Sequence, residues 1–160
     1  MAPTQNSEFA MLNGKTIFWI IIGVFAGFLT GSLVNLMIVL TSLLFYVPPD
    51  GMDWNDQAAV AQFIGGLPMG AFLFALAAHG AHSLVAGWIA AAIARPFRYT
   101  AALIVGSLTL AAGALNLQDI PHPAWFGYVD LLLYLPLAAL GATLVKQQPN
   151  VKTDQEPETA

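Results

Sequence analysis

Five polar side chains lie inside long apolar stretches, where they could bind a proton or an ion, or one another. His79 and Asp130 are the ionisable members of this set, and Tyr134 follows Asp130 at a spacing of four, on the same helix face. Asn35 and Asn116 are the neutral members. Ionisable groups within a membrane span are energetically costly and usually face the bundle interior. His79 and Asp130 are therefore the first candidates for a functional role.

The depth of these side chains follows from the rise of a helix, about 1.5 Å per residue. Counted from the ends of the expected helices, Asn35, Asn116 and Asp130 lie at a similar level near one membrane surface, and His79 lies nearer the midplane. One interpretation is a polar cavity that opens to the outside, with Tyr134 in its wall and His79 at its floor. The alternative is hydrogen bonding between helices that only fixes the bundle.

His79 and His82 form an H-x-x-H pair, about 60° apart around a helix. A zinc site needs further ligands, and the chain has no cysteine and no glutamate nearby. We therefore predict no metal site. A haem or a pigment could use His79 as a ligand if another helix or a second copy of the chain supplied a second one. The alternative is a histidine bonded to a backbone carbonyl or to an asparagine, with no cofactor.

Motifs of the common enzyme classes are missing from the sequence. There is no H-E-x-x-H zinc motif, no G-x-S-x-G turn around a nucleophile, and no glycine-rich phosphate loop after a strand. The five Lys and Arg residues form no basic patch of the kind that binds nucleic acid. We predict that the protein is not an enzyme and has no nucleic-acid partner.

The elements that must position these residues are long apolar helices. Of the 160 residues, 58% are hydrophobic and 9% are charged, whereas a soluble domain carries about 25% charged residues. About 20 apolar residues cross a bilayer as a helix. Four segments approach or exceed that length, at 16–47, 67–94, 99–117 and 125–145. The sequence predicts an all-α integral membrane protein, folded as a four-helix bundle in the lipid bilayer.

Small residues recur at helical spacing within these segments. Gly23, Gly27 and Gly31 follow one another every four residues, so they share one face of the first helix. Gly87 and Gly106 lie on similar small-residue faces of the second and third helices. Such faces let helix backbones approach closely in lipid. They predict helix packing within the chain, in a homo-oligomer or against a larger membrane complex.

The basic residues predict the orientation in the membrane. All five fall in the N-terminal segment, in the connection at 95–98 or near the C-terminus, whereas the loops at 47–66 and 118–124 carry aspartates and no Lys or Arg. By the positive-inside rule, both termini are cytoplasmic and these two loops are outside. We predict a short helix at 54–64, capped by Asp53 and lying on the outer surface. Residues 1–15 form an N-terminal segment, 16–146 the membrane domain, and 147–160 a disordered cytoplasmic tail.

Several short motifs occur in order along the chain. After the glycine face come Val34-Asn35, Pro49-Asp50-Gly51-Met52-Asp53, Asn55-Asp56, Leu67-Pro68-Met69-Gly70-Ala71-Phe72, His79, Pro121-His122-Pro123-Ala124-Trp125-Phe126 and Leu135-Pro136. Over about residues 23–144, this succession resembles a small four-helix bacterial inner-membrane protein family of uncharacterised function. The resemblance implies a bacterial inner-membrane location, and it implies no activity.

Three functions are compatible with these observations. The first is a non-catalytic accessory or assembly subunit that packs through its small-residue helix faces. The second is a small oligomeric transporter or channel that uses the polar layer around Asp130 and His79. The third is a haem- or pigment-binding subunit that uses His79 as its ligand.

Overall fold

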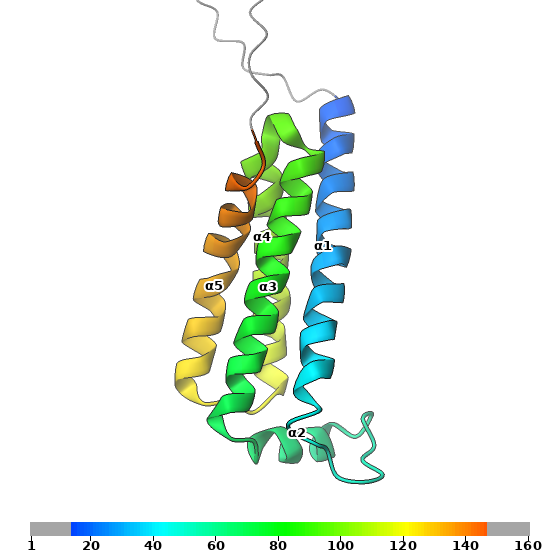
Figure 1. Cartoon of the computed structure of the whole chain (residues 1–160), viewed down its shortest axis with the longest axis vertical. Helices are drawn as coiled ribbons and strands as arrows, with labels where there is room; N and C mark the ends of the chain where they lie inside the picture. Colours follow the sequence, from blue (N-terminus) through cyan, green and yellow to red (C-terminus); the bar gives the residue numbers. More distant parts are fainter. Residues whose placement is uncertain (1–13, 147–160) are drawn as a thin grey trace, which may run out of the picture.

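The computed structural model describes residues 14–146, which form a bundle of helices (Figure 1). Four of the helices are long and apolar enough to cross a membrane. They are α1 (Gly14–Ser42), α3 (Met69–Ile93), α4 (Arg98–Asp119) and α5 (Ala124–Thr143). A shorter helix, α2 (Gln57–Gly65), and a 3-10 turn, η1 (Arg95–Phe97), connect them. The predicted all-α class is confirmed for residues 14–146, and the four helices long and apolar enough to cross a membrane indicate a multi-pass membrane protein.

Helix α3 is the central element, because it packs against α1, α4 and α5. Helix α2 lies across one end of the bundle, and both ends of the described chain lie at the opposite end (Figure 1). The expected N-terminal segment 1–15 lies outside the described residues except for Gly14 and Lys15, which already belong to α1. The expected tail at 147–160 lies wholly outside them.

The two ends of the bundle differ in charge. The end that holds the start of α1 and the end of α5 carries the described basic residues, Lys15, Arg95, Arg98 and Lys146. The end covered by α2 carries four aspartates, Asp50, Asp53, Asp56 and Asp119. We call them the basic end and the acidic end. Apart from Asp130, every charged residue of the described chain lies at one of these two ends.

Two local predictions were wrong. Helix α1 ends at Ser42 rather than at residue 47, and turns follow it in which the amides of Phe45 and Tyr46 donate to the Ser42 carbonyl. The prolines at 48 and 49 explain the early end, since proline lacks an amide and disfavours a helical residue before it.

The cap of α2 was also assigned to the wrong aspartate. Asp56 is the cap, because its Oδ1 accepts from the amides of Ala58 (2.9 Å) and Ala59 (3.3 Å). Asp53 instead closes a turn by accepting from the Asn55 amide at 2.9 Å.

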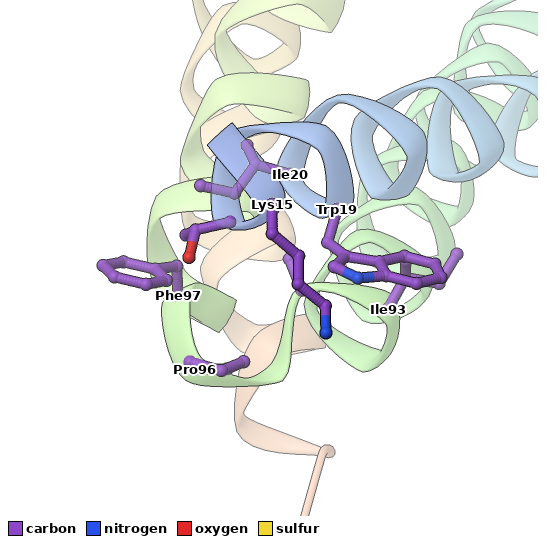
Figure 2. Close-up of a pocket in the computed structure, with 8 residues that line it drawn as sticks. Lys15, Trp19, Ile20, Ile93, Pro96 and Phe97 are labelled. Atoms are coloured by element: carbon purple, nitrogen blue, oxygen red, sulfur yellow. The ribbon is translucent and has the colours of Figure 1, made fainter. Parts of the chain in front are cut away.

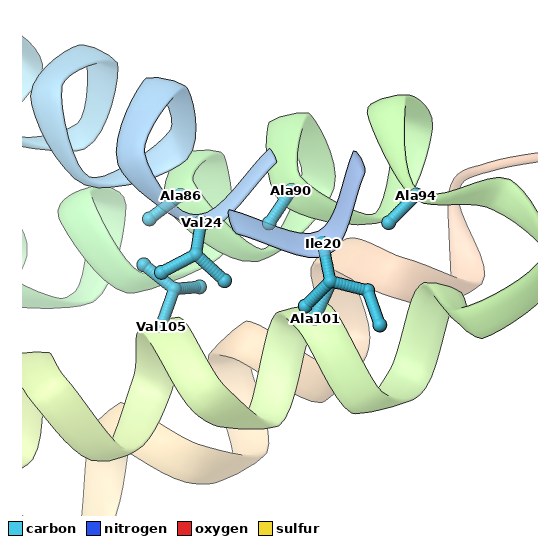
Figure 3. Packing of buried hydrophobic residues seen from close by; sticks show 7 residues of the cluster. All are labelled: Ile20, Val24, Ala86, Ala90, Ala94, Ala101 and Val105. Carbon is cyan, nitrogen blue, oxygen red and sulfur yellow. The ribbon is translucent and has the colours of Figure 1, made fainter. Parts of the chain in front are cut away.

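The packing between α1, α3 and α4 depends on small side chains. Figure 3 shows Ala86 and Ala90 of α3, and Ala94 directly after its end, facing the branched side chains of the neighbouring helices. Those branched residues are Ile20 and Val24 of α1 and Val105 of α4. The alanines bring the helix backbones close together, so that packing and not hydrophobic exclusion from water stabilises the contact in lipid.

The glycine face of α1 lies against α3 of the same chain. A Cβ atom on Gly23 would come within 2.8 Å of the Ala90 carbonyl oxygen, and one on Gly27 would collide with the Ala86 carbonyl oxygen. A Cβ atom on Gly31 would come within 2.8 Å of the His82 ring. This face is therefore filled from within the chain and is not open to the helix of another protein.

Glycines on α3 and α4 meet α5 in the same way. A Cβ atom on Gly87 would overlap the backbone of Ala138, and one on Gly106 would lie 2.8 Å from the Ala138 side chain. All five glycines that the sequence singled out for packing thus lie where two helices touch. Gly141 makes an equally close approach from α5, because a Cβ atom there would meet the Leu84 carbonyl oxygen.

Replacing Arg98 by alanine is expected to lower the free energy of unfolding by about 1 kcal/mol. Its Nη1 donates to the Val145 carbonyl at 2.7 Å, just past the end of α5, where a cation also complements the helix dipole. Arg95 is the matched control, because it is exposed and makes only a 3.4 Å contact with the Ala92 carbonyl. Thermal unfolding in detergent would measure both, and equal losses would contradict the assignment.

Candidate functional site: a buried His–Asp–Tyr cluster

Three of the predicted polar residues form one cluster between α3 and α5. Nδ1 of His79 lies 2.7 Å from Oδ1 of Asp130, and the Tyr134 hydroxyl donates to Oδ2 of Asp130 at 2.9 Å. The same hydroxyl lies 3.1 Å from Nδ1 of His79. Asp130 is fully buried, Tyr134 is 1% exposed, and the His79 side chain is 19% exposed. Asp130 is the only carboxylate of residues 14–146 that lies inside a long helix and away from its ends, and the cluster joins it to a phenol and an imidazole.

The hydrogen bonds indicate where the protons lie. An ionised carboxylate only accepts hydrogen bonds, so both partners of an ionised Asp130 must donate. Tyr134 donates its hydroxyl proton, and His79 then carries a proton on Nδ1. Within residues 14–146, Nε2 of His79 has no hydrogen-bond partner, and the ring is the part of the cluster that is partly exposed. Nε2 is the atom at which a proton or a ligand could reach the cluster.

Close packing fixes the cluster on its other sides. The His79 and Tyr134 rings are stacked, with centroids 5.9 Å apart. A Cβ atom on Gly113 of α4 would collide with the Tyr134 hydroxyl, so this glycine makes the room that the phenol occupies. Towards the acidic end, Phe126 lies 6.5 Å from His79 and 5.5 Å from Phe72, measured between ring centroids. The Phe72–Phe126 pair therefore covers the histidine on that side.

His82 belongs to a different contact. Its Nε2 lies 3.3 Å from the Thr109 hydroxyl, which itself donates to the Val105 carbonyl at 2.9 Å. Because the hydroxyl proton is used in this way, the imidazole donates from Nε2. Phe28 packs edge-on against the His82 ring, with centroids 5.4 Å apart. His82 thus links α3 to α1 and α4.

The two asparagines do not join the cluster. Asn116 is exposed near the end of α4, and Asn35 is half-buried on α1. No hydrogen bond within the described part of the chain links either side chain to His79, Asp130 or Tyr134. His79 and Asp130, which the depth count placed at different levels, are in direct contact through their side chains. The structure therefore has no single polar layer among residues 14–146 but a compact polar contact between α3 and α5.

No protein-family model, curated protein or solved structure matches the chain. The resemblance to a bacterial inner-membrane family therefore stays a prediction.

Metal and cofactor binding have few candidate ligands. Among residues 14–146, no three His, Asp or Glu side chains lie close enough together to hold a metal ion. Nδ1 of His79 is engaged by Asp130, which leaves Nε2 as the ring nitrogen that could bind a haem or a pigment. Donation from the other ring nitrogen to a carboxylate is common in metal-binding histidines, so the chemistry of His79 is compatible with that alternative.

A cavity of about 320 Å³ lies at the basic end, between the start of α1 and the turn after α3. Figure 2 shows the Lys15 side chain extending from α1 between Pro96 on one side and the Trp19 indole, which lies beside Ile93, on the other. A lysine and a tryptophan in this position are typical of residues at a membrane surface. The cavity is remote from the His79–Asp130 contact, so it forms no part of the candidate site.

The Ser83 hydroxyl is buried and has no hydrogen-bond partner in the described structure. We expect Ser83→Ala to leave the free energy of unfolding unchanged or to raise it by up to about 1 kcal/mol, since an unpaired polar group is lost. Thr109→Val is the matched comparison and should lower it by about 1–3 kcal/mol, because it leaves the donor of His82 unpaired. Thermal unfolding in detergent measures both changes. A marked loss from Ser83→Ala would show that the hydroxyl has a partner.

Proposed function

We propose that the protein is a small membrane transport protein in which the His79–Asp130–Tyr134 cluster takes up and releases a proton. The observation that carries the proposal is the 2.7 Å contact between His79 and a fully buried Asp130 inside the spans. Burying an ionised carboxylate is costly even when it accepts hydrogen bonds, so a buried Asp130 is weak evidence for a purely stabilising role. Ionisable residues within a membrane are rare, and they commonly mark ion and substrate pathways.

The cluster can store a proton without any change in the backbone. A proton arriving at Nε2 of His79 makes an imidazolium, and the proton on Nδ1 can then pass to Oδ1 of Asp130. The result is a neutral imidazole protonated on Nε2 and a neutral carboxylic acid, so one proton has been gained. The Tyr134 hydroxyl holds the second carboxyl oxygen during this step. Release of the proton follows the same path in reverse.

Infrared difference spectroscopy of the protein in lipid vesicles tests the proposal directly. Acidification should produce a carboxylic-acid band that is missing from Asp130→Asn, a substitution that keeps the shape of the side chain. Asp119→Asn removes an exposed aspartate at the acidic end and is the matched control, so it should retain the band. Identical spectra for the natural protein and Asp130→Asn would mean that Asp130 exchanges no proton, and the proposal would fail.

We further propose the orientation in the membrane. The concentration of Lys and Arg at one end of the bundle supports a cytoplasmic position for that end, and hence for both termini, in a bacterial inner membrane. Helix α2 and the acidic end then face outside. Labelling of single cysteines at Lys146 and Asn55 with a membrane-impermeant reagent tests this orientation, since the chain has no cysteine of its own. Only the cysteine at position 55 should react in intact cells.

An accessory or assembly role is the second candidate, and a groove between α1 and α4 favours it. The groove has a volume of about 490 Å³, and its lining is wholly apolar, including Phe25, Ile104 and Leu108. A helix of a second copy or of a larger complex could fill it. A single cysteine at Leu108 should then form disulfide-linked dimers in the membrane, whereas one at the exposed Tyr128 on α5 should not. Equal crosslinking at both sites would contradict a specific contact.

A further inference from the structure

A second cavity lies at the acidic end, on the far side of the Phe72–Phe126 pair from His79. Its volume is about 230 Å³. An engineered apolar cavity of about 150 Å³ is large enough to bind benzene, so this one can hold a substituted ring or a small branched group. Phe126 lines the cavity and also contacts His79, and it therefore lies between the cavity and the proton-binding cluster.

Aromatic rings form much of the wall of this cavity. Six Phe, Tyr and Trp residues contribute rings, and His122 adds an imidazole; the six are Tyr46, Trp54, Phe63, Phe72, Phe74 and Phe126. They come from four parts of the chain, namely the connection after α1, helix α2, the first turns of α3 and the start of α5. Several are in contact as edge-to-face pairs, such as Trp54 with Phe63 and Tyr46 with Phe74. Rings gathered around a cavity favour a cation, because the face of each ring carries negative charge.

The charges around the cavity have one sign. Asp53 precedes the lining residue Trp54, and Asp119 precedes the lining residue Ile120; both aspartates are exposed. Asp50 and Asp56 lie in the same connection as Asp53. The basic residues of the described chain all lie at the other end of the bundle. The electrostatic field at this end therefore attracts cations and repels anions.

We propose that this cavity binds an organic cation of the quaternary ammonium type. An inorganic cation would keep its water shell and gain little from an apolar wall, whereas a methylated ammonium is weakly hydrated and matches aromatic faces. The cavity supplies the aromatic faces, and the aspartates at the acidic end supply the attraction over longer distances. That this cation is the transported substrate rests on the proposed function, but binding to the cavity does not.

Calorimetric titration of the full chain in a maltoside detergent, which carries no ammonium group of its own, tests the inference. The probe is benzyltrimethylammonium. The neutral control is dimethyl benzyl carbinol, which has nearly the same shape. The cation should bind about ten-fold more tightly than the alcohol, since contacts with aromatic rings can contribute that much. Equal affinities, or no saturable binding of the cation, would overturn the proposal.

Two substitutions locate the binding site. Phe63→Leu removes a ring from the cavity wall and should weaken cation binding about five-fold while leaving binding of the alcohol nearly unchanged. Phe25→Leu makes the same change at an exposed position on α1, outside this cavity, and should have no effect. Equal losses from both would place the cation elsewhere and overturn the proposal.

The fluorescence of Trp54 reports cation binding independently of proton binding at Asp130. Cation binding should change the emission of the natural protein, and Trp54→Phe, which retains an aromatic ring, should remove that change but not the binding. If the cation does not bind while Asp130 still shows its carboxylic-acid band, the inference about the cavity fails and the proton-binding proposal stands. If the cation binds and the carboxylic-acid band of Asp130 is absent, the inference about the cavity stands and the proton-binding proposal fails.

Discussion

Replacing Asp130 by leucine is expected to destabilise the bundle by about 2–5 kcal/mol, because two groups at a buried site each lose a hydrogen-bond partner at a cost of about 1–3 kcal/mol. Leucine branches at the same carbon as aspartate but offers no acceptor. His79 and the Tyr134 hydroxyl would both lose their carboxylate partner, and the hydroxyl is buried where water cannot replace it. The loss therefore comes from groups left unpaired and not from an empty space.

A double substitution separates this cause from a simple packing defect. His79→Leu combined with Asp130→Leu removes both ionisable groups, so the double variant should be more stable than Asp130→Leu alone. The comparison needs Asp130→Leu, His79→Leu and the double variant. Circular dichroism during a thermal ramp in detergent would measure the unfolding of all three. If the two losses simply add, His79 and Asp130 are not energetically coupled. Proton uptake should be absent from both variants that lack Asp130.

Replacing Gly27 by alanine is expected to lower the free energy of unfolding by about 1–3 kcal/mol, the usual range for an overpacked contact. The added methyl group would collide with the Ala86 carbonyl oxygen and lie 3.2 Å from the Ala90 amide nitrogen. Both are backbone atoms of α3, so no side-chain rotation relieves the collision. Helices α1 and α3 must separate, and leucine at this position should prevent their packing altogether.

Gly14→Ala is the matched control, because it lies on the same helix and a Cβ atom there meets nothing within 4 Å. It should leave the free energy of unfolding within about 0.5 kcal/mol of the natural protein. The measurement is again thermal unfolding in detergent, together with the yield of monodisperse protein. Comparable losses from Gly14→Ala and Gly27→Ala would mean that helix propensity and not the α1–α3 contact governs the effect.

The sequence predicts the spans well because the bilayer sets their length and composition. Four apolar runs became four helices, and most boundaries lie within two residues of the expected ones. The exceptions lie at two ends of helices that are determined by prolines or by a capping residue and not by apolar character. Val47 is apolar but precedes two prolines, so α1 ends earlier than hydropathy alone suggests. At α2, Asp53 and Asp56 have equal propensity to cap a helix. Asp56 is the cap because the helix begins at Gln57, directly after it.

The candidate site was predictable only as a set of residues. His79, Asp130 and Tyr134 stand out in the sequence as polar groups in apolar segments, and the spacing of four places Tyr134 beside Asp130. Depth counting then grouped Asp130 with Asn35 and Asn116, which do not contact it. The count failed because it uses distance along each helix and contains no information on the direction in which a side chain points.

What the sequence determined by itself is the class of protein, the four spans, the small-residue faces and the separation of charge between the two ends. All of these depend on composition and on periodicity along one helix. Only the tertiary structure decided which helix each face meets. The glycine face of α1 packs on α3, His79 meets Asp130, and His82 meets Thr109. The physical reason is that a helix apolar all round can present any face to lipid, so its rotation is fixed only by the neighbours that fit it closely.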